Sequence, residues 1–161
     1  MVERLQRLDW IFERSPVYFV TACTHNRRAI LTDARVHKRV LQFAADGLNH
    51  GAWLGAFVLM PDHLHAFVAL GNGDGQRPPL QLGQWVKALK GALSEVLRNT
   101  GVEGPYWQKG FFDHLLRSEE SYTEKWDYVR QNPVRAGLVR RWEDWPYFGE
   151  PFPLELRKDH L

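Results

Sequence analysis

Two apolar runs separated by only two residues constrain the fold more than any other feature of this sequence. The runs are Ala52–Met60 and His63–Leu70, and only Pro61 and Asp62 lie between them. Each run has the length and composition of a β-strand, and so short a connection is typical of a tight antiparallel hairpin. The sequence therefore predicts a hairpin near the middle of the chain.

Further strands and helices are predicted on both sides of this hairpin. Strands are indicated by β-branched and aromatic content, and helices by apolar residues at helical intervals. The predicted segments are the strands Val17–Thr24 and Tyr106–Arg117 and the helices Asp33–Asn49 and Leu82–Arg98. A last helix is predicted toward Asn132, because Ser121 and Glu124 form an S-x-x-E capping box. Its alternative start is Ser118.

The order of these elements, β-α-β-β-α-β and then a helix, predicts an α+β fold. Such an order is typical of a ferredoxin-like (split βαβ) antiparallel sheet, with the strand that begins at His63 in its centre. We expect residues 1–161 to form a single domain, because a chain of this length can bury a core without covalent staples. Gly71–Pro79 has the composition of a surface loop and is too short to separate two domains. From about residue 140 to residue 161, a Pro- and Trp-rich tail is expected to wrap over the surface.

Composition favours a cytoplasmic protein that has no membrane partner. The single cysteine, Cys23, excludes an internal disulfide and fits a reducing compartment. No apolar run approaches the length of a membrane span, and the charged N-terminus lacks the apolar region of a signal peptide. The net charge of +2 permits a nucleic-acid partner without requiring one.

The triplet His63-Leu64-His65 is the most informative about chemistry. Residues two apart on a strand face the same side, so both imidazoles can reach one ligand while Leu64 enters the opposite layer. Imidazole binds many divalent metals. On spacing alone, two hydrogen-bonded histidines at the start of a strand explain the triplet equally well.

Tyr128 and Asn132 are four residues apart, so on one helix they would project from the same face. If that face covers the central strand, a phenol and an amide oxygen lie beside the two histidines. Oxygen donors suit Mg²⁺ or Mn²⁺. Pro133 works against this geometry, because a proline disfavours helical backbone angles at the residue before it. Spacing alone favours a packing tyrosine and a helix-terminal asparagine.

Two motifs, taken together, resemble those of one transposase family. Met60–His65 (MPDHLH) and the strand after it are similar to the histidine motif of the IS200-like, single-tyrosine HUH transposases. Tyr128–Val139 (YVRQNPVRAGLV) resembles the tyrosine segment of one branch, the REP-associated tyrosine transposases. Trp107–His114 and Val20–Thr24 also match that branch. The resemblance covers about residues 18 to 139 and fades after residue 146.

This resemblance implies an enzyme that nicks and rejoins single-stranded DNA beside palindromic hairpins through a 5′-phosphotyrosine. It implies that His63 and His65 bind Mg²⁺ or Mn²⁺, that Tyr128 is the nucleophile, and that Asn132 is a third metal ligand. His114 is a further candidate ligand. The implied partner is single-stranded hairpin DNA, bound by a monomer or a homodimer. One alternative is a non-catalytic, domesticated hairpin DNA- or RNA-binding protein of the same fold, and another is a metal-dependent hydrolase that forms no covalent intermediate.

Basic and aromatic side chains near these motifs are predicted to contact the DNA. Cationic side chains would bind phosphates with strong salt dependence, and Trp107, Tyr106 and Phe111 would stack on bases. For any one basic residue, a solvated surface position is an equally good explanation. The predicted DNA contacts are Arg27, Arg28, Lys87, Lys90, Arg98, Trp107, Arg130 and Arg135.

Overall fold

The computed structural model describes residues 16–71 and 80–154, in which five strands form one antiparallel sheet. The strands are β1 (Val17–Cys23), β2 (Ala52–Leu59), β3 (His63–Leu70), β4 (Phe112–Leu116) and β5 (Phe148–Gly149). Their order across the sheet is β4-β1-β3-β2-β5. The predicted hairpin is therefore confirmed, and the strand that begins at His63 is central, with β1 and β2 on its two sides.

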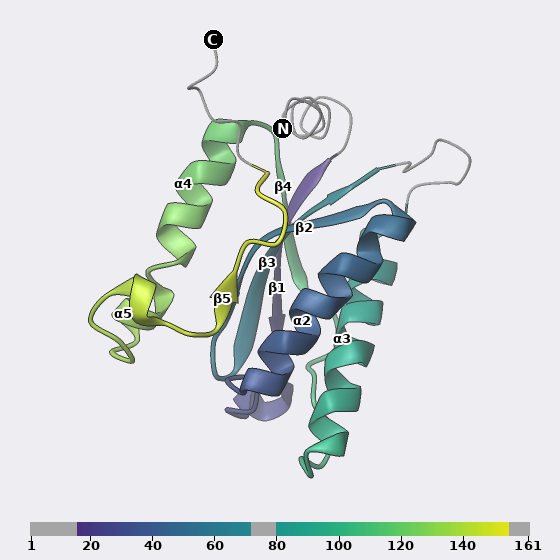
Figure 1. Cartoon of the computed structure of the whole chain (residues 1–161), viewed down its shortest axis with the longest axis vertical. Coiled ribbons are helices and arrows are strands. Elements are labelled where there is room, and N and C mark those ends of the chain that lie inside the picture. The colour runs from purple at the N-terminus through teal and green to yellow at the C-terminus, as the bar shows by residue number, and fades with distance from the viewer. Residues whose placement is uncertain (1–15, 72–79, 155–161) are drawn as a thin grey trace.

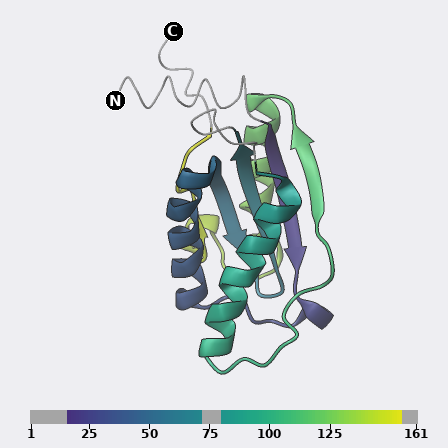
Figure 2. The ribbon, with the colours of Figure 1, turned by 90° about the vertical axis from the view of Figure 1, so that its right-hand side faces the viewer.

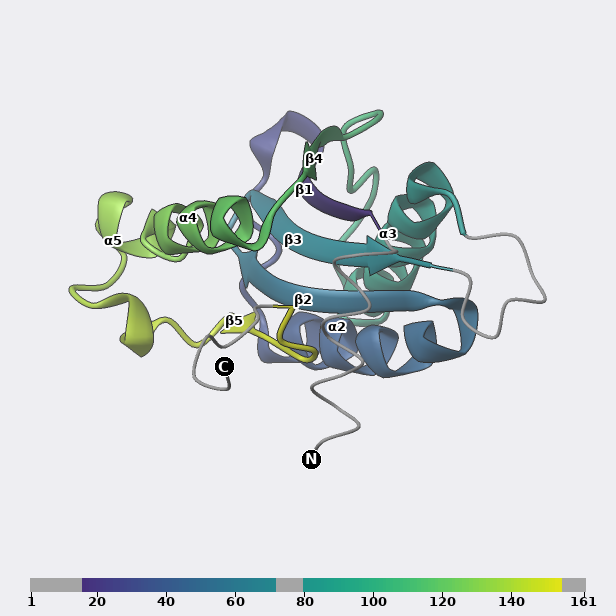
Figure 3. The same ribbon diagram turned by 90° about the horizontal axis from the view of Figure 1, so that it is seen from above.

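Helices cover both faces of this sheet. The helices α2 (Ala34–Gly47) and α3 (Leu82–Asn99) lie side by side on one face (Figure 2). The helix α4 (Glu119–Val129) lies on the opposite side of the sheet from them (Figures 1 and 3). Each face has its own apolar cluster, with Trp85 and Leu89 on the first and Phe67 and Trp126 on the second. No helix in the described part of the chain is long and apolar enough to cross a membrane.

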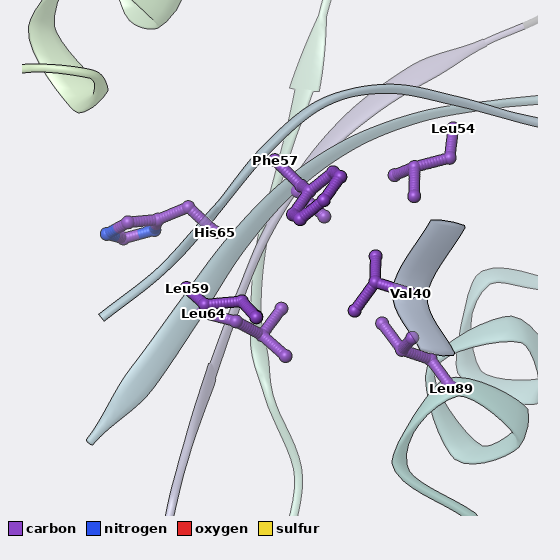
Figure 4. A pocket seen from close by; sticks show the side chains of 8 residues that line it. Val40, Leu54, Phe57, Leu59, Leu64, His65 and Leu89 are labelled. Carbon is purple, nitrogen blue, oxygen red and sulfur yellow. The ribbon is translucent and has the colours of Figure 1, made fainter. Parts of the chain in front are cut away.

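Alternation along β3 determines which face each of its side chains reaches. Leu64 belongs to the cluster on the α2 and α3 face, whereas Phe67 belongs to the cluster under α4. His63 and His65 lie four and two residues before Phe67, so their side chains project from the same face of β3 as Phe67 does. Figure 4 shows the imidazole of His65 pointing away from Val40 and the other apolar side chains that line a small pocket beneath α2 and α3. Both histidines therefore lie on the face that α4 covers.

A bulge in β2 anchors α4 to the sheet. The pairing of β2 with β3 shifts its register between Leu54 and Phe57. Within the bulge, the N–H of Ala56 donates a hydrogen bond of 3.0 Å to the hydroxyl of Tyr122 on α4. A side chain on the neighbouring Gly55 would block this approach, because its Cβ would lie 2.8 Å from the same hydroxyl. The bulge thus gives α4 a fixed point over the sheet.

Two predicted elements differ from the structure, and a third lies almost entirely outside the described residues. The strand predicted over Tyr106–Arg117 is only β4, because the chain turns at Gly110 with φ +80° and Trp107 forms an isolated bridge with Thr24. The last helix is capped by Ser118, whose hydroxyl accepts from the N–H of Ser121, so the capping box predicted at Ser121 is wrong and the alternative start at Ser118 is confirmed. Of the predicted loop Gly71–Pro79, only Gly71 lies within the described residues.

The segment after residue 140 packs more deeply than the sequence predicts. Instead of wrapping over the surface throughout, it adds β5 to the edge of β2. Trp145 and Leu154 are buried in the cluster beneath α4, and the indole N–H of Trp145 donates to the carbonyl of Leu59 at 3.0 Å. The segment therefore packs on the face of the sheet on which the two histidines lie.

Removing the hydroxyl of Tyr122 is expected to weaken the attachment of α4. In Tyr122→Phe the buried N–H of Ala56 loses its acceptor, which should lower the free energy of unfolding by about 1–3 kcal/mol. Urea unfolding followed by tryptophan fluorescence measures this difference. Tyr128→Phe is the matched control, because Tyr128 is 62% exposed and its change should cost less than about 0.5 kcal/mol. Equal stability of both variants would contradict the anchoring role.

Candidate active site

The imidazoles of His63 and His65 lie together at the start of β3. Their ring centroids are 4.9 Å apart and the ring planes are nearly perpendicular, at 80°. On the neighbouring strand β1, Cys23 pairs with His63 and Thr21 pairs with His65. The two rings are thus brought together by the period of a single strand, as the sequence predicted.

Each imidazole is oriented by a hydrogen bond at its Nδ1 atom. Nδ1 of His63 lies 2.8 Å from Oδ1 of Asp62, and Nδ1 of His65 lies 2.8 Å from Oγ1 of Thr21. Such partners fix the ring orientation and the tautomer of metal-binding histidines. With Nδ1 engaged in both rings, Nε2 is the nitrogen that each ring can offer to a metal.

The carboxylate of Asp62 is itself held in place. Its Oδ2 accepts from Nε of Arg27 at 2.9 Å, and its carbonyl accepts from the N–H of the fully buried Thr24 at 2.9 Å. Partial burial raises the pKa of the Asp62 carboxyl, but hydrogen bonds from His63 and Arg27 outweigh burial and lower its pKa below the ordinary value. Asp62 therefore stays ionised and keeps accepting from His63.

The environment of His65 keeps its imidazole neutral. Burial, followed by the electrostatic influence of His63, Lys125 and Arg135, lowers the pKa of His65 to about 3. Phe19 stacks against the ring with centroids 5.2 Å apart. Since only the neutral imidazole binds a metal, His65 is a competent ligand at neutral pH without losing a proton first.

The donor atoms fit a mixed nitrogen and oxygen metal site. Two oriented imidazoles supply the nitrogens, and in the described residues no cluster of three His, Cys, Asp or Glu side chains could hold a metal ion. Amide, water and phosphate oxygens are donors that would complete such a site. Oxygen donors beside imidazole are acceptable to Mg²⁺ and Mn²⁺.

Tyr128 and Asn132 do not lie on one helix, which corrects the geometry predicted from their spacing. The helix α4 ends at Val129, and Asn132 is the first residue of the short helix α5 (Asn132–Arg135). The proline at position 133 begins this new helix, where a proline needs no amide hydrogen. A break at residues 130–131 therefore separates the phenol from the amide.

Arg135 links the two side chains across this break. Its guanidinium carbon lies 4.0 Å from the ring centroid of Tyr128, and its Nη2 donates to the carbonyl oxygen of Tyr128 at 2.8 Å. The same Nη2 donates to Oδ1 of Asn132. The charge of Arg135 also contributes to the lowered pKa of His65. Arg135 thus links Tyr128 with Asn132, and its charge acts on His65.

A second series of contacts joins α4 to the histidines. The ammonium group of Lys125 lies 4.8 Å from the ring centroid of Phe19, which in turn stacks on His65. Further along α4, Trp126 packs edge-on against Phe67 of β3, with centroids 6.2 Å apart. The helix therefore runs along the same sheet face toward the end at which β3 begins (Figure 1).

Most of the predicted DNA contacts are not grouped around the histidines. Arg130 pairs with Asp127 at 2.7 Å and lies over Trp142, Arg28 donates to the carbonyl of Glu103, and Trp107 donates to Ser94. The ammonium group of Lys90 donates to two carbonyls of the segment before β4, and Lys87 and Arg98 are exposed on α3 across the sheet. Arg27 and Arg135 are the predicted contacts that the structure places beside the site.

Sequence reasoning missed Thr21 and Asp62 as partners of the histidines. Asp62 was visible as an acidic neighbour of His63, but Thr21 lies 44 residues before His65 and carried no local signal. The further candidate ligand, His114, is exposed on β4 and pairs in register with Phe19, so its side chain shares the face of the histidines.

Comparison with protein families decides the relationship of this chain. A family model described as "Transposase IS200 like" matches residues 15–132, which is well over half of the 161 residues. The chain belongs to the IS200-like transposase family. The matched region includes His63, His65, Tyr128 and Asn132.

Two relatives share part of this IS200-like sequence. The REP-associated tyrosine transposase of Escherichia coli (strain K12) is 29% identical over 94 residues, which cover 58% of this chain and 52% of the relative. A Haemophilus influenzae protein that carries the same name provisionally is 30% identical over 97 residues, or 57% of this chain and 55% of the relative. The chain thus spans about half the length of the curated relatives it matches.

A solved structure shows the same fold. The structure of a REP-associated tyrosine transposase bound to a REP hairpin superposes with a TM-score of 0.65 over 84% of this chain and 76% of that one, at 23% identity. The predicted α+β architecture with an antiparallel sheet is confirmed by this likeness and by the strand order given above.

Loss of the Asp62 carboxylate is expected to weaken metal binding. Asp62→Asn retains the shape but removes the charge that orients His63, and such changes typically reduce metal affinity by about 10–100-fold. Titration calorimetry with Mn²⁺ measures the dissociation constant. Asp33→Asn is the matched control, because Asp33 caps α2 away from the histidines. The same Mn²⁺ affinity in both variants would show that Asp62 does not position His63.

Neutral His65 predicts that metal-free protein loses stability in mild acid. The pKa of His65 is about 3 in the folded protein and 6.5 ordinarily, so below pH 6.5 the unfolded state binds more protons than the folded state. The free energy of unfolding therefore decreases as the pH is lowered. At about pH 5 this amounts to about 2 kcal/mol. Urea unfolding in chelator at about pH 7.5 and about pH 5 should show that His65→Gln loses less stability than the unchanged protein. Parallel pH dependences would contradict the assigned environment of His65.

Proposed function

We propose that this chain is a single-strand DNA endonuclease and strand transferase that acts beside hairpin-forming DNA. The observation that carries this proposal is the pair of oriented imidazoles on the face that also holds the tyrosine helix. Membership of the IS200-like transposase family supports the reaction class. The structural relative bound to a REP hairpin supports a palindromic, hairpin-forming substrate.

Tyr128 is the proposed nucleophile. Its phenol oxygen attacks the scissile phosphorus, and the bond from phosphorus to the 3′ oxygen breaks. The products are a 5′-phosphotyrosine and a free 3′-hydroxyl. Because the new linkage is also a phosphodiester, a second 3′-hydroxyl can displace the tyrosine and rejoin DNA without an added energy source. The high exposure of Tyr128 lets a DNA strand reach it.

His63 and His65 are the proposed metal ligands, with Asn132 as the third. When bound, Mg²⁺ or Mn²⁺ supplies positive charge that polarises the scissile phosphate. Thr21 and Asp62 orient the two rings, and Arg135 keeps the Oδ1 atom of Asn132 next to the tyrosine segment. An amide oxygen has two lone pairs, so Asn132 can accept from Arg135 and still offer one to a metal.

The contacts of Arg135 support a site built within one chain. Arg135 contacts the ring of Tyr128, and its charge lowers the pKa of His65. Its guanidinium also offers donors to the phosphate that Tyr128 would carry, since guanidinium groups bind phosphate oxygens strongly. This supports a monomer that would hold the nucleophile, the metal ligands and a phosphate-binding cation together.

Replacing Tyr128 with phenylalanine is expected to abolish cleavage and to leave hairpin binding nearly unchanged. The substrate is a set of labelled single-stranded hairpins from the flanks of its own gene, incubated with Mn²⁺ and separated on denaturing gels. A labelled band at protein mass, absent in Tyr128→Phe and in chelator, is the expected result. Retained nicking by Tyr128→Phe would remove Tyr128 from the reaction.

The same gels distinguish the non-catalytic alternative. Hairpin retention without a covalent band, over all metals and hairpins tried, would identify a binding protein that no longer cuts. His63→Ala supplies the control for the metal site, because recovery of its activity at high Mn²⁺ would indicate weakened metal affinity rather than a lost chemical group.

A further inference from the structure

The aromatic side chains that the sequence nominated for base stacking are packed against the protein itself. Tyr106, Trp107 and Phe111 all contact the apolar cluster on the α2 and α3 face. The hydroxyl of Tyr106 donates to the carbonyl of Val102, and the indole of Trp107 donates to Ser94. None of these three rings is therefore positioned to receive a base at the histidine site.

Phe112, the next residue along, is exposed on the opposite face. Its side chain is 70% exposed, although it lies within a strand of the sheet. It pairs in register with Thr21 of β1, so the two side chains project from the same face with Cβ atoms roughly 5 Å apart. Thr21 is the residue that bonds His65 at 2.8 Å. The exposed ring of Phe112 is thus the direct cross-strand neighbour of Thr21, which orients the proposed metal ligand His65.

Two further side chains extend this surface along the sheet. His114 follows Phe112 on the same face of β4 and pairs with Phe19. The ammonium group of Lys125 lies over Phe19 from the side of α4. The face of β4 therefore presents a ring and an imidazole beside the strand that orients His65, with the ammonium group of Lys125 from α4 alongside.

We propose that this face of β4, made by Phe112 and His114, stacks unpaired bases of the DNA strand next to the scissile phosphate. The inference rests on the proposed function, because it takes single-stranded DNA as the ligand. A base that stacks on one exposed ring contributes about 1–3 kcal/mol whatever its identity, and a neighbouring cation suits the phosphate that follows it. A single ring is too small for a stable protein interface, which buries about 800 Å² on each partner.

The chain offers a matched control on the same strand. Leu115 is 40% exposed and pairs with Tyr18, so it projects from the other face of β4. Leu115→Ala removes a comparable apolar side chain from the same edge strand without touching the proposed stacking surface. Phe112→Trp keeps an aromatic ring, whereas Phe112→Leu keeps only apolar bulk.

The experiment measures DNA binding in the Tyr128→Phe background, so that cleavage does not interfere. The probes are fluorescein-labelled stem-loops from the flanks of its own gene, made with a short unpaired tail on one side, on the other side, or on neither. Phe112→Ala and Phe112→Leu should weaken binding of one tailed stem-loop about tenfold, and Phe112→Trp should restore it. Binding of the blunt stem-loop, and all binding by Leu115→Ala, should stay unchanged. Abasic positions in the tail should abolish the difference between Phe112 variants.

Equal binding of Phe112→Ala and its parent to every probe would overturn the inference, as would equal weakening on tailed and blunt stem-loops. A change in the sedimentation of DNA-free protein on mutating Phe112 would overturn it too, because the face would then be a protein interface. A Phe112 effect confined to tailed probes would support stacking even if the parent chain with Tyr128 forms no covalent adduct, in which case only the proposed catalysis fails.

Discussion

The hydrogen bond from the N–H of Ala56 to the hydroxyl of Tyr122 connects the sheet to the helix that carries Tyr128. It exists because β2 is bulged at this point, which frees one backbone N–H from the ladder, and because Gly55 leaves room for the phenol. A buried N–H must have an acceptor, so the bulge and the tyrosine require one another. With α4 fixed in this way, the ring of Phe67 and the histidines before it lie under one helix.

The sequence predicted the centre of the sheet well and its edges less well. Alternation on β3 and the two-residue turn are local signals, and they located both strands of the hairpin and the side to which the histidines point. Tyr106–Arg117 misled because aromatic content does not distinguish a strand from a loop whose rings pack on a core. Trp107 and Tyr106 satisfy their polar atoms with α3 and with the loop that follows it, and these contacts are not visible in the local pattern.

The candidate site was predictable in its principal residues and unpredictable in its supports. His63 and His65 share a strand, so their proximity follows from geometry alone. Tyr128 and Asn132 looked like helix neighbours, but a new helix begins before Pro133, and Arg135 makes the connection instead. Only the folded chain brings Thr21 to His65 and Arg27 to Asp62. The sequence also could not separate basic residues that are free to bind DNA from those that already bind other protein groups. Arg130 and Lys90 are of the second kind.

The entry to and the exit from the tyrosine segment lie at opposite edges of the sheet. The chain reaches α4 from β4, the outermost strand on one side, and after α5 it returns to β5, the outermost strand on the other. The segment therefore crosses the width of the sheet and is joined at each end to an edge strand (Figure 1). The position of the tyrosine segment over the sheet depends on the lengths of two connections, residues 117–118 and 136–147, as well as on side-chain contacts. A longer or shorter connection at either end would move Tyr128 over a histidine pair that stays where it is.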